Sequence, residues 1–323
     1  MAEIIGQGIQ VPEKVLTNQD LEKLVDTSDE WIVTRSGIRE RRIAADNEFT
    51  SHMAVEAAKG AIQEAGLQKE DINQIILATL TPDHILPSCA CEIQSALGIS
   101  GIPAFDISAA CSGFIYGLEI ASTMIDSCVY KNTLLIAAEK LSTVIDWTDR
   151  STCVLFGDGA GAAVLSANES GGHRILSVHT GADGSNYETL YIPGGAIAEP
   201  ITAETLDNHR HYVHMNGREL FKIAVRAMVE ASETALDKAG IGKKDVTWVV
   251  PHQANIRILK STANRLGVPE SRLVTNLDKY GNTSAASIPV ALYEGRERFS
   301  KGDIVLCPAF GGGLTWGAAV IEW

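Results

Sequence analysis

The sequence predicts an α/β fold of two similar halves, with sheets and helices stacked in five αβαβα layers. Segments 61–79 and 235–253 match at an offset of 174 residues, and helical and strand patterns alternate in both copies. A repeated order of elements indicates duplication, and helix–strand alternation indicates sheets covered by helices. We place the halves at 1–170 and 171–323, with the join near the polar, glycine-rich segment 166–173.

The elements follow from local patterns along the chain. Residues 4–9 are mostly apolar and predict a first strand. Alanines at helical spacing over 54–65 predict a helix that stops at Gly66. The apolar run 75–77 predicts a short buried strand. The stretch 114–125 is apolar with few charges and predicts a helix buried between the two sheets, which supplies the central layer.

Composition excludes several classes of protein. The chain has 323 residues, of which 45% are apolar and 21% charged, which is typical of a globular protein with about two domains of core. A net charge of −13 argues against nucleic-acid binding. No apolar run approaches the roughly 18–20 residues of a membrane span, and the N-terminus lacks the basic region of a secretory signal. We therefore expect a cytoplasmic protein whose six cysteines form no disulfides.

The segment FDISAACSGF at 105–114 places Cys111 after a loop of small residues and at the start of the apolar helix. A thiol at a helix N-terminus lies near free backbone N–H groups, which predicts a lowered pKa and a reactive thiolate. The alternative is a small buried cysteine. Cys89 and Cys91, spaced C-x-C, fit neither a zinc nor a redox motif, and we interpret them as buried residues.

Two further motifs carry polar side chains at the ends of predicted elements. His252, in WVVPHQAN (248–255), follows a buried strand, where α/β sheets bind ligands; a structural histidine fits equally well. Asn282, in YGNTSAAS (280–287), precedes a small-residue helix start and is inferred to occupy a place comparable to that of Cys111. A turn or helix-cap asparagine is the alternative.

We consider three further segments as an oxyanion-binding turn, a dinucleotide site and a metal site. The glycines of FGGGLTWG (310–317) allow a tight turn that could aim an N–H at an oxyanion. FGDGAGA (156–162) runs into a strand rather than a helix, so we reject a dinucleotide site. HRHYVH (209–214) has three histidines without an acidic or cysteine ligand set, so we expect a polar insert and no metal.

In this order and spacing, the motifs resemble those of β-ketoacyl-acyl carrier protein synthase III, the initiating condensing enzyme of type II fatty acid synthesis. The resemblance runs from TSDEWIVTRSGIRER (27–41) to GGGLTWGAAV (311–320). It implies the thiolase fold, a homodimer and no cofactor, CoA thioesters being substrates.

The resemblance also implies a ping-pong reaction. An acyl-CoA acylates Cys111; malonyl-acyl carrier protein then loses CO₂, and its carbanion attacks the acyl-enzyme. His252 and Asn282 would stabilise the charge that develops during decarboxylation. The N–H groups of Cys111 and Gly312 would form the oxyanion hole.

Binding residues follow from the same resemblance. Trp31 and Arg150 would sandwich the CoA adenine. The positions implied to line the CoA or pantetheine channel are Arg35, Gly217, Phe221 and Asn255. The basic positions implied at its mouth, which would attract the acidic carrier protein, are Lys222, Arg257 and Lys260.

The chain departs from acetyl-primed members of the family at two places that affect the choice of acyl primer. Leu86 stands where acetyl-primed members have a phenylalanine that the partner subunit contributes to the acyl pocket, so we expect longer or branched primers. The segment 193–214 is longer than in those members and edges the channel, which leaves the choice of substrate open.

Rival enzymes fit less well. A degradative thiolase would have its second cysteine at Ala309, whereas Cys307 lies two residues earlier. A hydroxymethylglutaryl-CoA synthase would need a glutamate in the motifs, and a plant-type polyketide synthase is longer. A secondary-metabolite condensing enzyme of the same subfamily remains open. A non-catalytic acyl-binding subunit is disfavoured because Cys111, His252 and Asn282 are all present.

Overall fold

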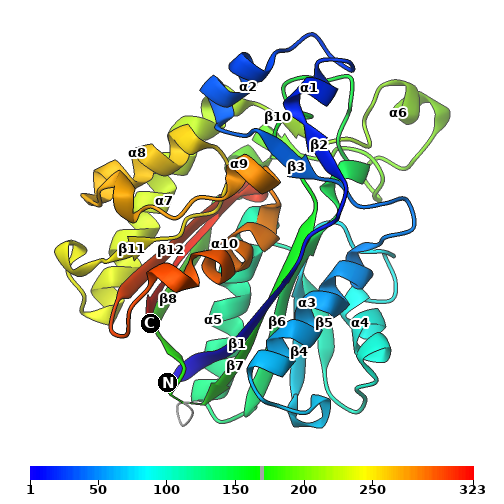
Figure 1. The fold of residues 1–323 in the computed structure, drawn as a ribbon. Helices are drawn as coiled ribbons and strands as arrows, with labels where there is room; N and C mark the ends of the chain where they lie inside the picture. The colour runs from blue at the N-terminus through cyan, green and yellow to red at the C-terminus, as the bar shows by residue number, and fades with distance from the viewer. Residues whose placement is uncertain (168–170) are drawn as a thin grey trace.

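The computed structural model describes residues 1–167 and 171–323 and is a mixed α/β protein (Figure 1). Its main sheet has the strand order β11-β12-β13-β8-β1-β7-β6-β4-β5. In the described ranges, two residue pairs, Glu3 with Arg174 and Ile4 with His173, join β1 to β8. The two sheets predicted from the sequence are therefore half-sheets joined edge to edge at this short pairing.

The elements divide between the two half-sheets and the upper part of the molecule in Figure 1. The first half-sheet and its helices comprise β1 (Ala2–Gln10), α3 (Thr50–Glu64), β4 (Gln74–Ala78), α4 (Cys89–Leu97), β5 (Ala104–Ile107), α5 (Gly113–Asp126), β6 (Asn132–Glu139) and β7 (Gly159–Ala167). The second comprises β8 (His173–Ala182), α7 (Gly217–Ala239), β11 (Trp248–Val249), α8 (Ile256–Leu266), α10 (Ser287–Gly295), β12 (Ile304–Gly311) and β13 (Thr315–Glu322). The shorter elements are β2 (Val15–Thr17), α1 (Asn18–Leu21), α2 (Asp29–Ser36), β3 (Glu40–Arg42), β9 (Leu190–Tyr191), α6 (Ala203–Asp207), β10 (His214–Met215) and α9 (Leu277–Tyr280).

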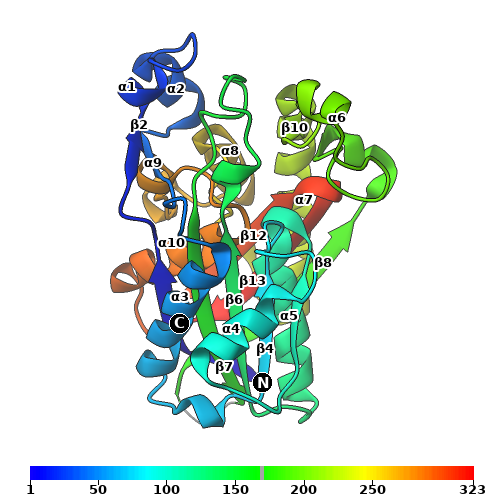
Figure 2. The same cartoon turned by 90° about the vertical axis from the view of Figure 1, so that its right-hand side faces the viewer.

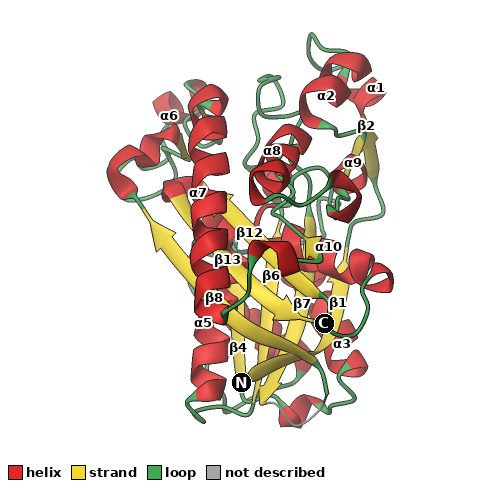
Figure 3. Cartoon of the chain, turned by 90° about the vertical axis from the view of Figure 1, so that its left-hand side faces the viewer, coloured by secondary structure: helices red, strands yellow, loops and turns green. Residues whose placement is uncertain are grey.

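The core shows five layers. One apolar cluster contains Phe114 of α5, Ile288 of α10, Ile76 of β4 and Val305 of β12, so α5 and α10 lie between the two half-sheets. A second cluster packs α3 and α4 on the outer face of β4, β6 and β7. A third packs α7 and α8 on the outer face of β12 and β13. Figures 2 and 3 show the outer helices from the two sides.

The repeat predicted from the sequence has a structural counterpart. In each copy a long helix, α3 or α7, is followed by a short 3-10 turn, Lys69–Asp71 or Lys243–Asp245, and then by β4 or β11. Gly66 and Gly240 follow the two helices with left-handed φ angles of 66° and 69°, as helix stops do. The division at 1–170 and 171–323 falls between β7 and β8 and stays a prediction, and its residues 168–170 lie outside the described residues.

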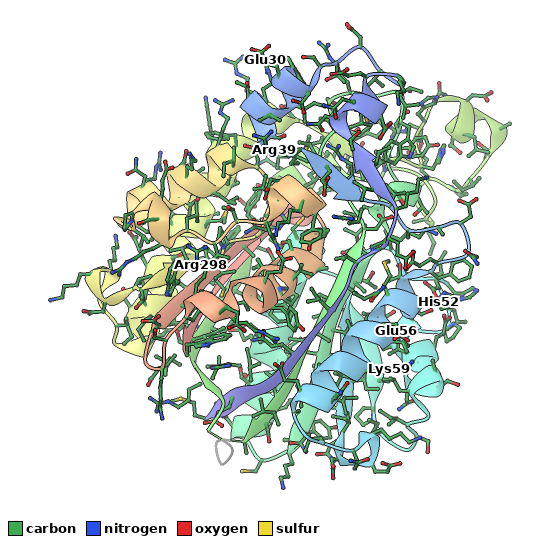
Figure 4. All side chains as sticks on the ribbon, in the orientation of Figure 1. Glu30, Arg39, His52, Glu56, Lys59 and Arg298 are labelled. Atoms are coloured by element: carbon green, nitrogen blue, oxygen red, sulfur yellow. The ribbon has the colours of Figure 1, made fainter. Side chains whose placement is uncertain are left out.

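Helix α3 shows why this sequence folds onto a sheet. Its alanines are buried against β1, β6 and β7, whereas His52, Glu56 and Lys59 point outward (Figure 4). Lys59 and Glu56 form an exposed ion pair of 2.7 Å. Because the residues of α3 that meet β1 are the small Ala57, Gly60 and Ala61, the helix backbone approaches this strand closely. Within the described residues, no helix is long and apolar enough to cross a membrane.

Gly8 of β1 lies at this close approach and generates a stability prediction. A β-carbon there would lie 2.1 Å from the Ala57 carbonyl oxygen and 2.5 Å from the Ala61 nitrogen. We expect Gly8→Val to lower the free energy of unfolding by about 3 kcal/mol, because backbone atoms cannot yield as a side chain can. Denaturant unfolding measures this.

The matched control is Gly184→Ala. A β-carbon at Gly184 would meet no atom of the described residues within 4 Å. This substitution should change stability by less than about 0.5 kcal/mol. Equal midpoints for Gly8→Val and wild type would refute the close packing of α3 on β1.

Candidate active site

Cys111 lies in a 3-10 turn, Ala110–Ser112, that leads directly into α5. The turn is tight: Ala110 has a left-handed φ of 45°. Gly311, at the end of β12, packs against it, because a β-carbon there would lie 2.6 Å from the Cys111 nitrogen. Only 7% of Cys111 is exposed. The nucleophile candidate is therefore held between the start of a central helix and the glycine-rich turn that contains Gly312.

The structure corrects the inferred equivalence of Asn282 and Cys111. The turn Ser284–Ala286 leads into α10 as Ala110–Ser112 leads into α5, and Ser284 has a left-handed φ of 49°, matching Ala110. At the offset that relates the two copies, the counterpart of Cys111 is Ala285. Asn282 lies three residues earlier, so the inference was wrong in register although both segments do reach one site.

His252 is positioned by its backbone and its ring. Its N–H donates to the Pro308 carbonyl oxygen at 2.9 Å, which ties the loop after β11 to β12. Its Nδ1 lies 2.7 Å from Ser287 Oγ, and the same oxygen accepts the Gln253 N–H at 3.2 Å. Because that oxygen already accepts one bond, its hydroxyl hydrogen can point to Nδ1, which leaves the proton of the ring on Nε2.

Burial determines the charge of this ring. His252 is almost inaccessible to solvent, and burial lowers its pKa to about 3. The imidazole is therefore neutral at pH 7, and a neutral ring with the hydroxyl of Ser287 on Nδ1 presents an N–H donor at Nε2. No motif had pointed to Ser287, although it is the last residue of the segment quoted around Asn282.

Asn282 is held by three hydrogen bonds. Its N–H donates to the Leu155 carbonyl oxygen at 2.8 Å, and its carbonyl oxygen accepts the Gly157 N–H at 3.0 Å. Its Oδ1 accepts the Ser284 N–H at 2.8 Å. Since the amide oxygen is used, Nδ2 is the end available to a ligand. The segment 156–162 does run into a strand, β7, and the Gly157 N–H in it helps to hold Asn282.

The three candidates meet at one cavity of about 140 Å³, lined by Cys111, His252 and Asn282. Apolar side chains form most of the remaining wall, among them Phe156, Met215, Leu220, Phe221, Ala224, Met228, Ile258 and Phe310. The structure thus brings together residues that are far apart in the sequence. Their catalytic roles remain predictions.

The predicted low pKa of Cys111 is wrong for the substrate-free chain. Burial raises the pKa of this thiol to about 12, and the nearby charge of Glu139 raises it further. The Ser284 side chain, whose effect is second to that of burial, and the backbone N–H of Cys111 lower the pKa but do not offset burial. The position at a helix start is as predicted, but loss of hydration outweighs the dipole in a site this dry. Cys111 is a thiol until something removes its proton.

A second cavity of about 520 Å³ opens to the surface and shares Gly217, Phe221 and Asn255 with the first. Trp31 and Arg35 also line it, as do Arg218, Lys222 and Arg257. Asn255 caps α8 through a bond from the Arg257 N–H and donates to the Arg35 carbonyl oxygen at 2.9 Å. The structure therefore places the predicted channel residues Arg35, Gly217, Phe221 and Asn255 along one continuous opening.

Two predicted binding residues are arranged differently. The Arg150 guanidinium already lies 5.2 Å from the centre of the Trp31 ring, so an adenine between them would have to separate them. Lys260 does not line the opening; its Nζ pairs with Glu270 at 2.7 Å. Lys222 and Arg257 do line it.

A third cavity, of about 380 Å³, also reaches Cys111. It shares Cys111, Phe156 and Leu190 with the first cavity, and its other lining residues include Leu80, Leu141, Tyr187, Tyr191, Ile192, Val213, Ser284 and Gly312. Sequence reasoning missed most of these residues because short, separate segments supply them without a motif. Leu86, which is 86% exposed, lines none of the three cavities of this single chain.

The remaining candidates lie elsewhere. Cys307, the nearest match to the second cysteine of a thiolase, is buried in β12 and lines none of the three cavities. His209, of the histidine-rich segment, pairs with Asp146 at 2.5 Å, an acidic partner that the sequence did not reveal. Within the described residues, the ligand atoms that cluster are those of Asp83, Cys89 and Glu92, not the three histidines.

Comparison with known proteins agrees with this architecture. The family model described as 3-oxoacyl-[acyl-carrier-protein (ACP)] synthase III matches residues 105–184, and the model of its C-terminal part matches residues 236–323. The β-ketoacyl-[acyl-carrier-protein] synthase III of Caldanaerobacter subterraneus is 51% identical, over 100% of this chain and 98% of that protein.

Solved structures agree as well. The crystal structure of 3-oxoacyl-[acyl-carrier-protein] synthase III from Aquifex aeolicus superposes with a TM-score of 0.92 at 51% identity and covers 100% of both chains. The priming β-ketosynthase of a polyketide biosynthetic pathway superposes with a TM-score of 0.90 at 33% identity, over 100% of this chain and 96% of that one. The five-layer architecture is the thiolase fold, as predicted, and this chain belongs to the β-ketoacyl-acyl carrier protein synthase III family of acyl-transferring condensing enzymes.

Proposed function

We infer that this enzyme initiates fatty acid synthesis by condensing an acyl-CoA primer with malonyl-acyl carrier protein, with loss of CO₂, to give a 3-oxoacyl-acyl carrier protein. The observation that carries the assignment of residues is the cavity shared by Cys111, His252 and Asn282. No cofactor is required, because the thioesters are already activated acyl donors.

The first half-reaction transfers the acyl group to Cys111. Its sulfur attacks the thioester carbonyl, a tetrahedral oxyanion forms, and CoA leaves as a thiolate. The backbone N–H groups of Cys111 and Gly312 would donate to that oxyanion. The close packing of Gly311 on Cys111 supports this pairing, since it brings the glycine turn against the nucleophile.

The second half-reaction needs donors that do not lose their protons. Decarboxylation of the malonyl group moves negative charge onto its thioester oxygen. Nε2 of a neutral His252 and Nδ2 of Asn282 suit this role, since the ring is neutral and each side chain's other polar atom is already engaged. The same two donors are not required for the first attack on the acyl-CoA.

The three cavities describe a path for the substrate. The 520 Å³ opening would hold the CoA nucleotide beside Trp31 and Arg150, with pantetheine passing Gly217 and Phe221. The 140 Å³ cavity would hold the reacting thioester, and the 380 Å³ cavity beyond Cys111 the acyl chain. Shared lining residues make this path continuous.

A basic rim at the opening would attract the acidic carrier protein. Lys222 and Arg257 supply it, with Arg218 beside them. Lys260 contributes less because Glu270 neutralises it. In a chain with a net charge of −13, such a local patch would direct an acidic partner to the channel.

A homodimer would complete the acyl cavity. Ile85 and Leu86 are large apolar residues that are 93% and 86% exposed on one loop, which is unfavourable unless a partner covers them. In the dimer, Leu86 would reach the partner's acyl cavity. We also propose a cytoplasmic location, which is where acyl-CoA and malonyl-acyl carrier protein would be available.

A secondary-metabolite condensing enzyme is the second candidate. The likeness to the priming β-ketosynthase of a polyketide pathway favours it, as does an acyl cavity of about 380 Å³. Product mass from an acyl-CoA panel, with carrier proteins of each pathway, separates the two. Turnover only with the fatty acid carrier protein supports the first function.

The nucleophile generates one prediction. Brief exposure to acetyl-CoA or octanoyl-CoA should add an acyl group to Cys111, as mapped by mass spectrometry of peptides. A general alkylator is a poorer probe, because Cys91 and Cys128 are exposed and Cys111 is a buried thiol. Cys307→Ala is the control and should leave acylation unchanged. A label on Cys153 or Cys307 would contradict the mechanism.

The two donors generate another prediction. His252→Ala and Asn282→Ala should each slow malonyl decarboxylation by about 10²–10³-fold, because a transition-state donor is lost. Both should still accept an acyl group on Cys111. His52→Ala, on the exposed face of α3, is the control. Equal losses of acylation and decarboxylation in both variants would contradict the assignment of His252 and Asn282 to the decarboxylation step alone.

Leu86 generates a prediction about the primer. An apolar tunnel gains roughly 0.8 kcal/mol for each buried CH₂, so wild type should use butyryl-CoA at least as well as acetyl-CoA. Leu86→Phe should lower the ratio of octanoyl to acetyl kcat/KM about tenfold, because the larger ring shortens the tunnel. Val129→Phe, an exposed apolar position that lines none of the three cavities, is the control. Strong preference for acetyl-CoA in wild type, unchanged in Leu86→Phe, would disprove it.

A further inference from the structure

A buried carboxyl group lies behind the nucleophile. Glu139 ends β6 and has no solvent exposure. Its Oε2 accepts bonds from Thr81 Oγ1 at 2.8 Å, the Leu80 N–H at 3.1 Å and Thr79 Oγ1 at 3.2 Å. Its Oε1 is also buried and has no hydrogen-bond partner within the described residues. The Oε2 atom of this carboxyl group thus accepts three hydrogen bonds, whereas Oε1 accepts none within the described residues.

Ser284 lies between this carboxyl group and Cys111. Its turn packs against both the Cys111 turn and β6. Its hydroxyl oxygen is buried, without a well-aligned partner among the described residues, while its N–H is bonded to Asn282. It lines the 380 Å³ cavity together with Cys111. A hydroxyl group so placed can pass a proton in either direction.

Among the residues that the structure describes, none gives the charge of Glu139 a cationic partner. Lys140 is the next residue, but its Nζ binds the carbonyl oxygens of Ala45 and Glu48 at 2.8 and 2.7 Å. Asp158, before β7, has both oxygens occupied by Ala44 and Ser142. The helices that pack on the two faces of β6 present apolar side chains to this strand.

The charge states of the two groups are coupled. Burial raises the pKa of Glu139 to about 7, and the Ser284 side chain lowers the pKa of both Glu139 and Cys111. A charged Glu139 raises the pKa of Cys111. Because two adjacent negative charges are unfavourable in a buried site, the carboxyl group and the thiol carry at most one negative charge between them.

We propose that Glu139 accepts the proton of Cys111 through the Ser284 hydroxyl. The S–H bond of Cys111 breaks and its proton goes to Ser284 Oγ, while the Ser284 hydroxyl proton passes to Glu139 Oε1. This leaves a thiolate, an intact hydroxyl and a neutral carboxyl group. The role rests on the proposed function in which Cys111 is acylated.

The rest of the cycle balances. The thiolate attacks the acyl carbon, a C–S bond to Cys111 forms, the C–S bond to CoA breaks, and the CoA thiolate takes a proton from water. Glu139 stays neutral during condensation, so no carboxylate opposes the carbanion. When the carbanion attacks, the bond to Cys111 breaks, and the released thiolate recovers its proton from Glu139 through Ser284.

Glu139→Gln tests the relay, because glutamine fills the same space but cannot accept the proton. The readouts are the burst of CoA released from acyl-CoA alone across pH, and malonyl decarboxylation by enzyme whose Cys111 is already acylated. Wild-type acylation should rise with pH through about 7. Glu139→Gln should be about 10²-fold slower at pH 7.5, without that rise, and should keep its decarboxylation rate.

Two variants serve as controls. Glu139→Asp keeps a carboxyl group and should restore part of the acylation rate and the pH-dependent rise. Asp158→Asn changes another fully buried carboxyl group, whose pKa burial also raises, and it should alter stability without altering the acylation profile. A folded Glu139→Gln with the wild-type profile overturns the proposal, as does equal slowing of both half-reactions.

A second variant covers the case in which Glu139→Gln does not fold. Ser284→Ala removes the bridging hydroxyl and keeps the carboxyl group, so it should show the same selective loss of acylation; an unchanged profile overturns the relay. Iodoacetamide alkylation of Cys111 across pH, mapped by mass, needs no acyl donor and therefore separates this proposal from the proposed function. An inflection near pH 7 in wild type, absent in Ser284→Ala, supports the relay, whereas identical alkylation profiles overturn it.

Discussion

The close contact between two helix starts is the constraint on which the rest of the structure depends. The turn before α5 and the turn before α10 pack against each other between the half-sheets. A β-carbon on Gly113 would lie 2.9 Å from that of Ala78 and 3.3 Å from that of Ala285. Only very small residues permit this approach. The contact brings Cys111, the candidate nucleophile, of one half against the hydrogen-bonding groups of the other.

The duplication explains why neither half carries a complete site. The first half supplies Cys111 and Glu139, and the second supplies His252, Asn282 and Ser284. Both helix starts keep a left-handed residue, Ala110 or Ser284. In one copy the residue after the left-handed one carries the thiol of Cys111, whereas in the other the left-handed residue itself carries a hydroxyl group. Packing the copies together creates the cavity that they share.

Dryness sets the chemistry of that cavity. Burial raises the pKa values of Cys111 and Glu139 and lowers that of His252, so each group is driven toward its neutral form. Hydrogen bonds from neutral donors are strong in such a buried site because water does not compete for them. Glu139 and Cys111 together carry at most one negative charge, while the basic residues lie at the surface opening, where hydration offsets their cost.

Local sequence patterns were sufficient to predict much of the fold and part of the candidate site. The α/β class, the repeat, α3 with its stop at Gly66 and the position of Cys111 before a helix depend on periodicity and on contiguous motifs, which a sequence displays directly. Tertiary structure alone decided the high pKa of Cys111, the protonated nitrogen of His252, the register of Asn282 and the presence of Glu139 behind the nucleophile. These depend on burial and on contacts between residues up to about 200 positions apart, and no local pattern records which groups lose water together.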